Sequence, residues 1–144
     1  MLPFTHMSFN PTFHLLSLRK GTIINKRHAA LWQAWGVLET RHGKPEDARN
    51  IFQQGIWACA QPSGGQSGGR RCARLWQAWG VLEAQEADYA AARRCFSRAL
   101  DADSRNVPAV TAWTVMEKNR GKYHEARLIF ESTFVGGLYR LLFI

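Results

Sequence analysis

The densest positive charge in the sequence comes from three arginines, Arg70, Arg71 and Arg74. Guanidinium groups this close together can hold the phosphates of a nucleic acid. The preceding segment, GGQSGG, has Gly64 and Gly69 at the GxxxxG spacing of a phosphate-binding loop. Arg70 and Arg71 replace the Lys and the Ser/Thr of that motif, and no strand is expected before it, so we interpret the segment as a flexible linker. The arginines are then either phosphate contacts or part of a solvated linker.

The other residues that could carry chemistry form no catalytic motif. The five histidines lack metal-ligand spacing, and the three cysteines form no CxxC pair, which is typical of buried thiols in a reducing compartment. No Ser, Cys and His share a motif for nucleophilic catalysis. We therefore predict that the chain is not an enzyme and has no cofactor, metal or small-molecule substrate. No apolar run reaches the ~18 residues of a membrane span, so we predict no membrane partner.

The string LWQAWGVLE occurs twice, at residues 31–39 and 75–83, and it belongs to a longer repeat. Alignment on the second Trp gives three units with the same residue types at fixed offsets. The recurring residues are Trp35, Trp79 and Trp113; Glu39, Glu83 and Glu117; Ala48, Ala92 and Ala126; Arg49, Arg93 and Arg127; and Phe52, Phe96 and Phe130. The second and third units are 34 residues apart, which is the period of a helix-turn-helix repeat. The first spacing is ten residues longer because of the Gly/Ser-rich linker.

Within each unit, apolar residues at helical spacing predict two helices. Gly43 and Gly121 are expected to end the first helix in the left-handed conformation. Ala87 stands at the same place in the second unit, so we predict a slightly strained turn there. The Trp and Phe columns are predicted to fill the space between the helices.

A first helix with the pattern W-x2-W-x3-E, followed by a second helix with ARxxF, resembles the half-a-TPR (HAT) repeat, a variant of the tetratricopeptide (TPR) repeat. The resemblance covers residues 28–134. It implies an all-α, TPR-like solenoid of about three units with a right-handed superhelix. We predict units at 28–57, 73–101 and 107–134, a flexible linker at 61–72, a poorly ordered basic segment at 1–27, and an apolar tail at 135–144.

The stretch from Ile51 to Thr114 is similar to plant and algal HAT proteins that act in the maturation of a chloroplast messenger RNA. That similarity implies a module that binds single-stranded RNA, in the 5′ region of an organellar transcript, and processes or stabilises it. The alternative is a protein-interaction scaffold within an RNA-processing complex. The location implied is the chloroplast, with the nucleus as the alternative. Family members have many more units, so a fragment is expected.

The residues expected to bind RNA or a peptide lie on the first helices, away from the apolar stripe. These helices line the concave face of such solenoids. Amide and guanidinium groups there can hydrogen-bond base edges or peptide groups. The candidates are one column formed by Gln33, Gln77 and Thr111, a second column formed by Arg41, Gln85 and Asn119, and the adjacent Lys118.

The Arg column has two possible roles, phosphate contact or an ion pair with the Glu column. Because the two columns recur together, we favour an ion pair across the two helices of one unit. The Trp column is interpreted as core rather than as a stacking surface for bases. The net charge of +8 lies entirely outside the predicted helices of the repeats, in the tails and the linker. Neutral repeats favour the scaffold alternative more than the total charge suggests.

Overall fold

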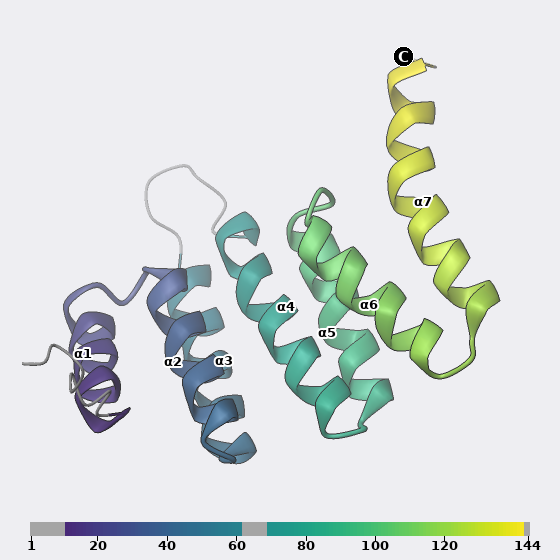
Figure 1. Ribbon diagram of the computed structural model, residues 1–144. Coiled ribbons are helices and arrows are strands. Elements are labelled where there is room, and N and C mark those ends of the chain that lie inside the picture. The colour runs from purple at the N-terminus through teal and green to yellow at the C-terminus, as the bar shows by residue number, and fades with distance from the viewer. Residues whose placement is uncertain (1–10, 62–68, 143–144) are drawn as a thin grey trace, which may run out of the picture.

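The computed structural model describes residues 11–61 and 69–142, with side chains at 12–61 and 69–133. The described residues form helices joined by short connections and contain no strand, which confirms the all-α prediction. In Figure 1 the helices follow one another in chain order. Their bounds are α1 Pro11–Ile24, α2 Ala29–Arg41, α3 Pro45–Ala60, α4 Gly69–Gln85, α5 Tyr89–Ala102, α6 Val107–Asn119 and α7 Tyr123–Leu142. Among these, no helix is both long and apolar enough to cross a membrane.

Six of the helices form three pairs, α2 with α3, α4 with α5 and α6 with α7. Each pair is joined by a tight turn with one residue in the left-handed conformation. The φ angles are 72° at Gly43, 62° at Ala87 and 76° at Gly121. Two helices begin with a side-chain cap: the Ala91 amide donates to Oδ1 of Asp88 at the start of α5, and the Ala109 amide donates to Oδ1 of Asn106 at the start of α6. The left-handed turns set the spacing within each pair, and the Asp88 cap adds to the turn between α4 and α5.

A phenylalanine of the second helix packs onto a glycine of the first helix in the first two pairs. Phe52 lies against Gly36, Phe96 lies against Gly80, and both rings are fully buried. A Cβ atom placed on Gly80 would lie 2.6 Å from Cε1 of Phe96. The glycine is therefore required where the helices approach closely, and the ring fills the space that it leaves.

The third pair departs from this arrangement. Thr114 takes the place in α6 that glycine holds in α2 and α4, and its Oγ1 is buried without a hydrogen-bond partner in the described part of the chain. Phe130, at the position of the buried rings, is 53% exposed. The prediction that Phe130 fills the space between helices is therefore wrong, because a Thr side chain occupies the space that glycine leaves open. Figure 1 shows α7 diverging from α6.

Helix α1 lies in the segment for which no helix was expected. Helix α1 has the same length as α5, and the spacing along the chain from α1 to α2 is the same as that from α5 to α6. Its packing also repeats that of α3 on α4: a Cβ on Gly21 would meet Leu31 at 3.0 Å, and a Cβ on Gly55 would meet Leu75 at 3.1 Å. Helix α1 thus occupies the place of a second helix before the first pair.

Two other predicted segment boundaries differ from those in the structure. Helix α7 continues through the predicted boundary at 134, and α4 begins at Gly69, inside the predicted linker. The part of that linker at 62–68 lies outside the described residues.

Candidate functional site

The Arg and Glu columns meet between neighbouring pairs of helices. Arg49 of α3 donates from Nε to Oε1 of Glu83 in α4 at 2.7 Å, and from Nη2 to Oε2 at 2.9 Å. Arg93 of α5 makes the same two bonds to Glu117 of α6, at 2.6 and 3.0 Å. The prediction of an ion pair is confirmed, but its placement within one unit is wrong. The second helix of each pair packs on the first helix of the next, so these bidentate contacts fasten consecutive pairs together.

The Trp column holds the same carboxylates in place. The indole Nε1 of Trp79 donates to Glu83 at 2.7 Å, and that of Trp113 donates to Glu117 at 3.3 Å. Burial opposes ionisation of Glu83, but the hydrogen bonds from Arg49 and Trp79 together outweigh it and lower its pKa. The hydrogen bond from Arg93 lowers the pKa of Glu117 against the opposing effect of burial. These tryptophans therefore hold buried carboxylates inside the array, which agrees with their interpretation as core residues.

The contacts between the Arg, Glu and Trp columns are incomplete in the first and in the last pair of helices. Glu39 accepts a hydrogen bond from Trp35 at 3.3 Å, but its Oε2 is buried with no hydrogen-bond partner among the described residues. Leu15 stands in α1 at the offset where α5 carries Arg93. At the other end, Arg127 pairs with Glu131 of its own helix at 2.7 Å, and its side chain is 77% exposed.

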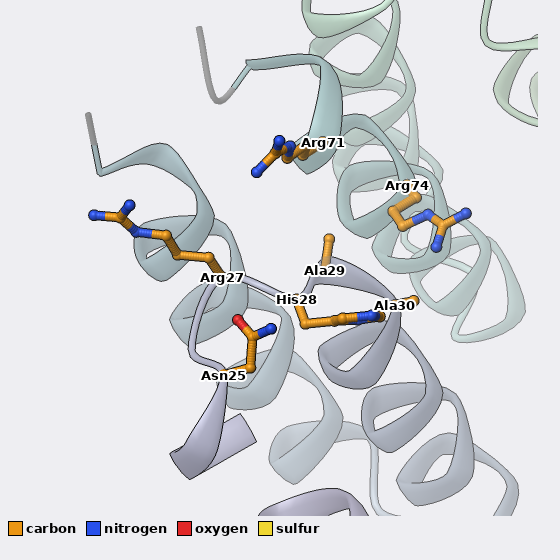
Figure 2. Close-up of a pocket in the computed structure, with 7 residues that line it drawn as sticks. All are labelled: Asn25, Arg27, His28, Ala29, Ala30, Arg71 and Arg74. Carbon is orange, nitrogen blue, oxygen red and sulfur yellow. The ribbon is translucent and has the colours of Figure 1, made fainter. Parts of the chain in front are cut away.

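A basic pocket of about 320 Å³ lies where the connection between α1 and α2 meets the first turns of α4 (Figure 2). Its cationic side chains come from segments more than 40 residues apart in the sequence, and no acidic residue lines it. Within the described residues, the arginines of the pocket make no ion pair. The lining residues are Asn25, Arg27, His28, Ala29, Ala30, Arg71 and Arg74.

The first turn of α2 forms part of this pocket and adds to its positive potential. Ala29 and Ala30 are the first residues of the helix, and the side chain of the preceding His28 does not cap it. The amides of a first turn lack intrahelical acceptors and carry the positive end of the helix dipole. Arginine residues and the first residues of a helix therefore line one cavity, and both are groups that can bind a phosphate.

The predicted arginine cluster is divided by the structure. Arg71 and Arg74 line the pocket, whereas Arg70 does not and instead has its Nε 3.6 Å from Oδ1 of Asp103. Sequence reasoning missed Arg27 and His28 as partners of the cluster. The available signal is the basic, acid-free composition of residues 1–30, of which residues 1–27 are predicted to be a poorly ordered segment.

The candidates on the first helices are distributed over separate surfaces. Gln85 and Asn119 line one groove of about 440 Å³ between α4 and α6. Arg41 lines a different groove, between α2 and α1. Lys118 and Thr111 are exposed. None of the seven candidates lines the basic pocket. Gln33 and Gln77 are half-buried, and neither amide makes a hydrogen bond within the described residues. The structure thus brings together only Gln85 and Asn119 in one groove.

The possible metal ligands and the cysteine thiols are the remaining groups that could carry chemistry. Within the described residues, no three His, Cys, Asp or Glu side chains gather as a metal site. The three cysteines are buried free thiols, as predicted, and burial raises the pKa of Cys95 to about 12. A neutral thiol with this pKa, such as that of Cys95, is a poor nucleophile.

Comparison with known proteins gives no relative from which a role could be transferred. No family model, no curated protein and no solved structure shows a significant match to this chain.

Proposed function

We propose that this protein is an RNA-binding array of TPR-like HAT repeats that takes part in the maturation or stabilisation of a chloroplast messenger RNA. The basic pocket formed by Arg27, His28, Arg71 and Arg74 is the observation that carries the proposal. Its arginines are not engaged by acidic side chains of the described chain, and the phosphate backbone supplies most of the affinity in non-specific RNA binding. The resemblance to HAT proteins supports the class of ligand and the chloroplast location.

The tandem arrangement supports the repeat class. The Arg–Glu contact that joins α3 to α4 recurs between α5 and α6 with matching donor and acceptor atoms. In repeat proteins, stability comes from contacts between neighbouring units of this kind. The pocket lies at the junction of α1, α2 and α4, so its geometry depends on the same stacking.

A titration of single-stranded RNA at increasing salt tests the proposal. For single strands, the slope of log affinity against log salt is about −0.7 for each phosphate neutralised, so three arginines correspond to about −2. We expect Arg71→Glu and Arg74→Glu to weaken binding and to reduce the slope. Arg70→Glu, whose side chain lies outside the pocket beside Asp103, is the matched control and is expected to change binding less. No measurable affinity at low salt, or equal effects of the three variants, would overturn phosphate binding in this pocket.

The alternative, a protein-interaction scaffold, is favoured by the groove between α4 and α6. Apart from Gln85, Asn119 and Arg120, its lining is apolar or aromatic and includes the 46% exposed Val115. Apolar grooves with a few amides accept amphipathic helices. If the RNA titration fails, this groove becomes the leading site, and Val115→Asp is the variant that should abolish binding of a partner helix.

A further inference from the structure

A further groove, larger than the basic pocket, lies between α1 and α3 over the start of α2. Its volume is about 680 Å³, and two cations, Arg19 and Lys26, line it without any acidic residue. Three amides and three tryptophans also line it, together with Thr22, Ile23 and Ala58. The lining includes Trp32, Trp35, Asn50, Gln53, Gln54 and Trp57.

Trp57 is the exposed aromatic residue of this groove. It is 71% exposed, whereas Trp32 is 8% exposed and stacks on Trp35 with 5.8 Å between ring centroids. The indole N–H groups of Trp32 and Trp35 are bonded to the Lys26 carbonyl and to Glu39. The indole of Trp57 has no hydrogen bond within the described residues. Tryptophan is enriched among the residues that carry most of the binding energy at interaction surfaces.

Three amide side chains of α3 lie on the face of the helix that lines this groove. Asn50, Gln53, Gln54 and Trp57 follow the spacing i, i+3, i+4 and i+7, which places them on one face of the helix. All four are exposed, and none of the three amides makes a hydrogen bond within the described residues. An amide can donate and accept at the same time, as recognition of a base edge requires.

The groove lies next to the basic pocket. Lys26 lines the groove, and its sequence neighbours Asn25 and Arg27 line the pocket, so the short connection between α1 and α2 separates the two cavities. Cationic residues therefore line both cavities, and each cavity could hold part of a phosphate backbone.

We propose that this groove binds a nucleobase of single-stranded RNA, stacked on Trp57, with the α3 amides at the base edge and Arg19 and Lys26 beside the backbone. This inference rests on the proposed function and assigns the position of a base relative to the phosphate in the basic pocket. Stacking on an aromatic ring accepts any base, so sequence preference at this position comes from Asn50, Gln53 and Gln54.

The test uses the full chain and a labelled single-stranded RNA of about ten nucleotides. Trp57→Ala is expected to weaken binding about 5- to 150-fold, which is the range for losing one base–aromatic stack. The salt slope should stay unchanged because no phosphate contact is lost, and Trp57→Phe should restore part of the affinity. Gln53→Ala should reduce discrimination between oligonucleotides that differ in one base. Its matched control is Ser97→Ala, an exposed residue at the same position of α5.

The outcomes separate this inference from the proposed function. RNA affinity that falls with Arg71→Glu but not with Trp57→Ala would overturn the base groove and leave the phosphate pocket standing. Loss of all RNA binding at low salt would overturn both. Binding of an acidic peptide, with a Trp57-dependent fluorescence change that RNA fails to produce, would also overturn the base groove. Unchanged circular dichroism of each variant shows that the fold is retained, as expected for an indole that is 71% exposed.

Discussion

The substitution Thr114→Gly is expected to close the third pair of helices. Gly36 and Gly80 let Phe52 and Phe96 pack against the first helix of their pairs, and Thr114 is the residue that blocks the same position for Phe130. Glycine at this position removes the obstructing Cβ and the buried Oγ1 that has no partner. The ring of Phe130 should then become buried, and the described start of α7 should align with α6.

The gain can be worked from the exposed fraction. A Phe side chain buries about 200 Å², and Phe130 is 53% exposed, so closure removes about 100 Å² of apolar surface from water. At about 25 cal/mol per Å², this contributes about 2.5 kcal/mol. Removing an unsatisfied hydroxyl adds about 1 kcal/mol, and glycine in a helix costs about 0.5 kcal/mol relative to Thr. The free energy of unfolding should therefore rise by about 3 kcal/mol.

Urea unfolding followed by far-UV circular dichroism measures this gain. With an m value of about 2 kcal/mol/M, the midpoint should move upward by about 1.5 M. Thr111→Gly is the matched control because Thr111 is exposed on the same helix, and it should lower stability by a few tenths of a kcal/mol. If Thr114→Gly behaves like Thr111→Gly, the Thr side chain is not the reason for the exposure of Phe130.

Two further expectations concern the carboxylates that face the neighbouring helices. Leu15→Arg should raise the thermal midpoint because it places a guanidinium where Glu39 has an oxygen without a partner, whereas Leu16→Arg on the exposed side of α1 should not. Glu83 and Glu117 have folded pKa values below the ordinary 4.5, so the stability that they contribute is present above pH 4.5 and is lost as the pH falls through those lowered values. Their double replacement by Gln should remove this acid-dependent loss in urea titrations at pH 2 to 7; an identical pH profile would refute the assignment.

Local features of the fold were readable from the sequence because they depend on spacing. The recurrence of Trp, Gly and Phe at fixed offsets predicted helices and core positions that the structure confirms for Phe52 and Phe96. The exposure of Phe130 could also have been inferred, because Thr114 replaces the glycine of the other units. Helix α1 was not predicted because it lacks the ARxxF pattern and has Leu15 and Leu18 in place of the Arg and the Phe.

Contacts between distant segments were decided by the tertiary structure. Sequence spacing shows that Arg and Glu recur together, but it does not show which helix lies beside which. Stacking places Arg49 against Glu83 of the following pair rather than against Glu39 of its own. The same stacking brings Arg27 to Arg71 around one pocket. The repeat pattern, with its period of 34 residues, encodes local helical packing, whereas these charge contacts arise only when neighbouring pairs of helices pack together.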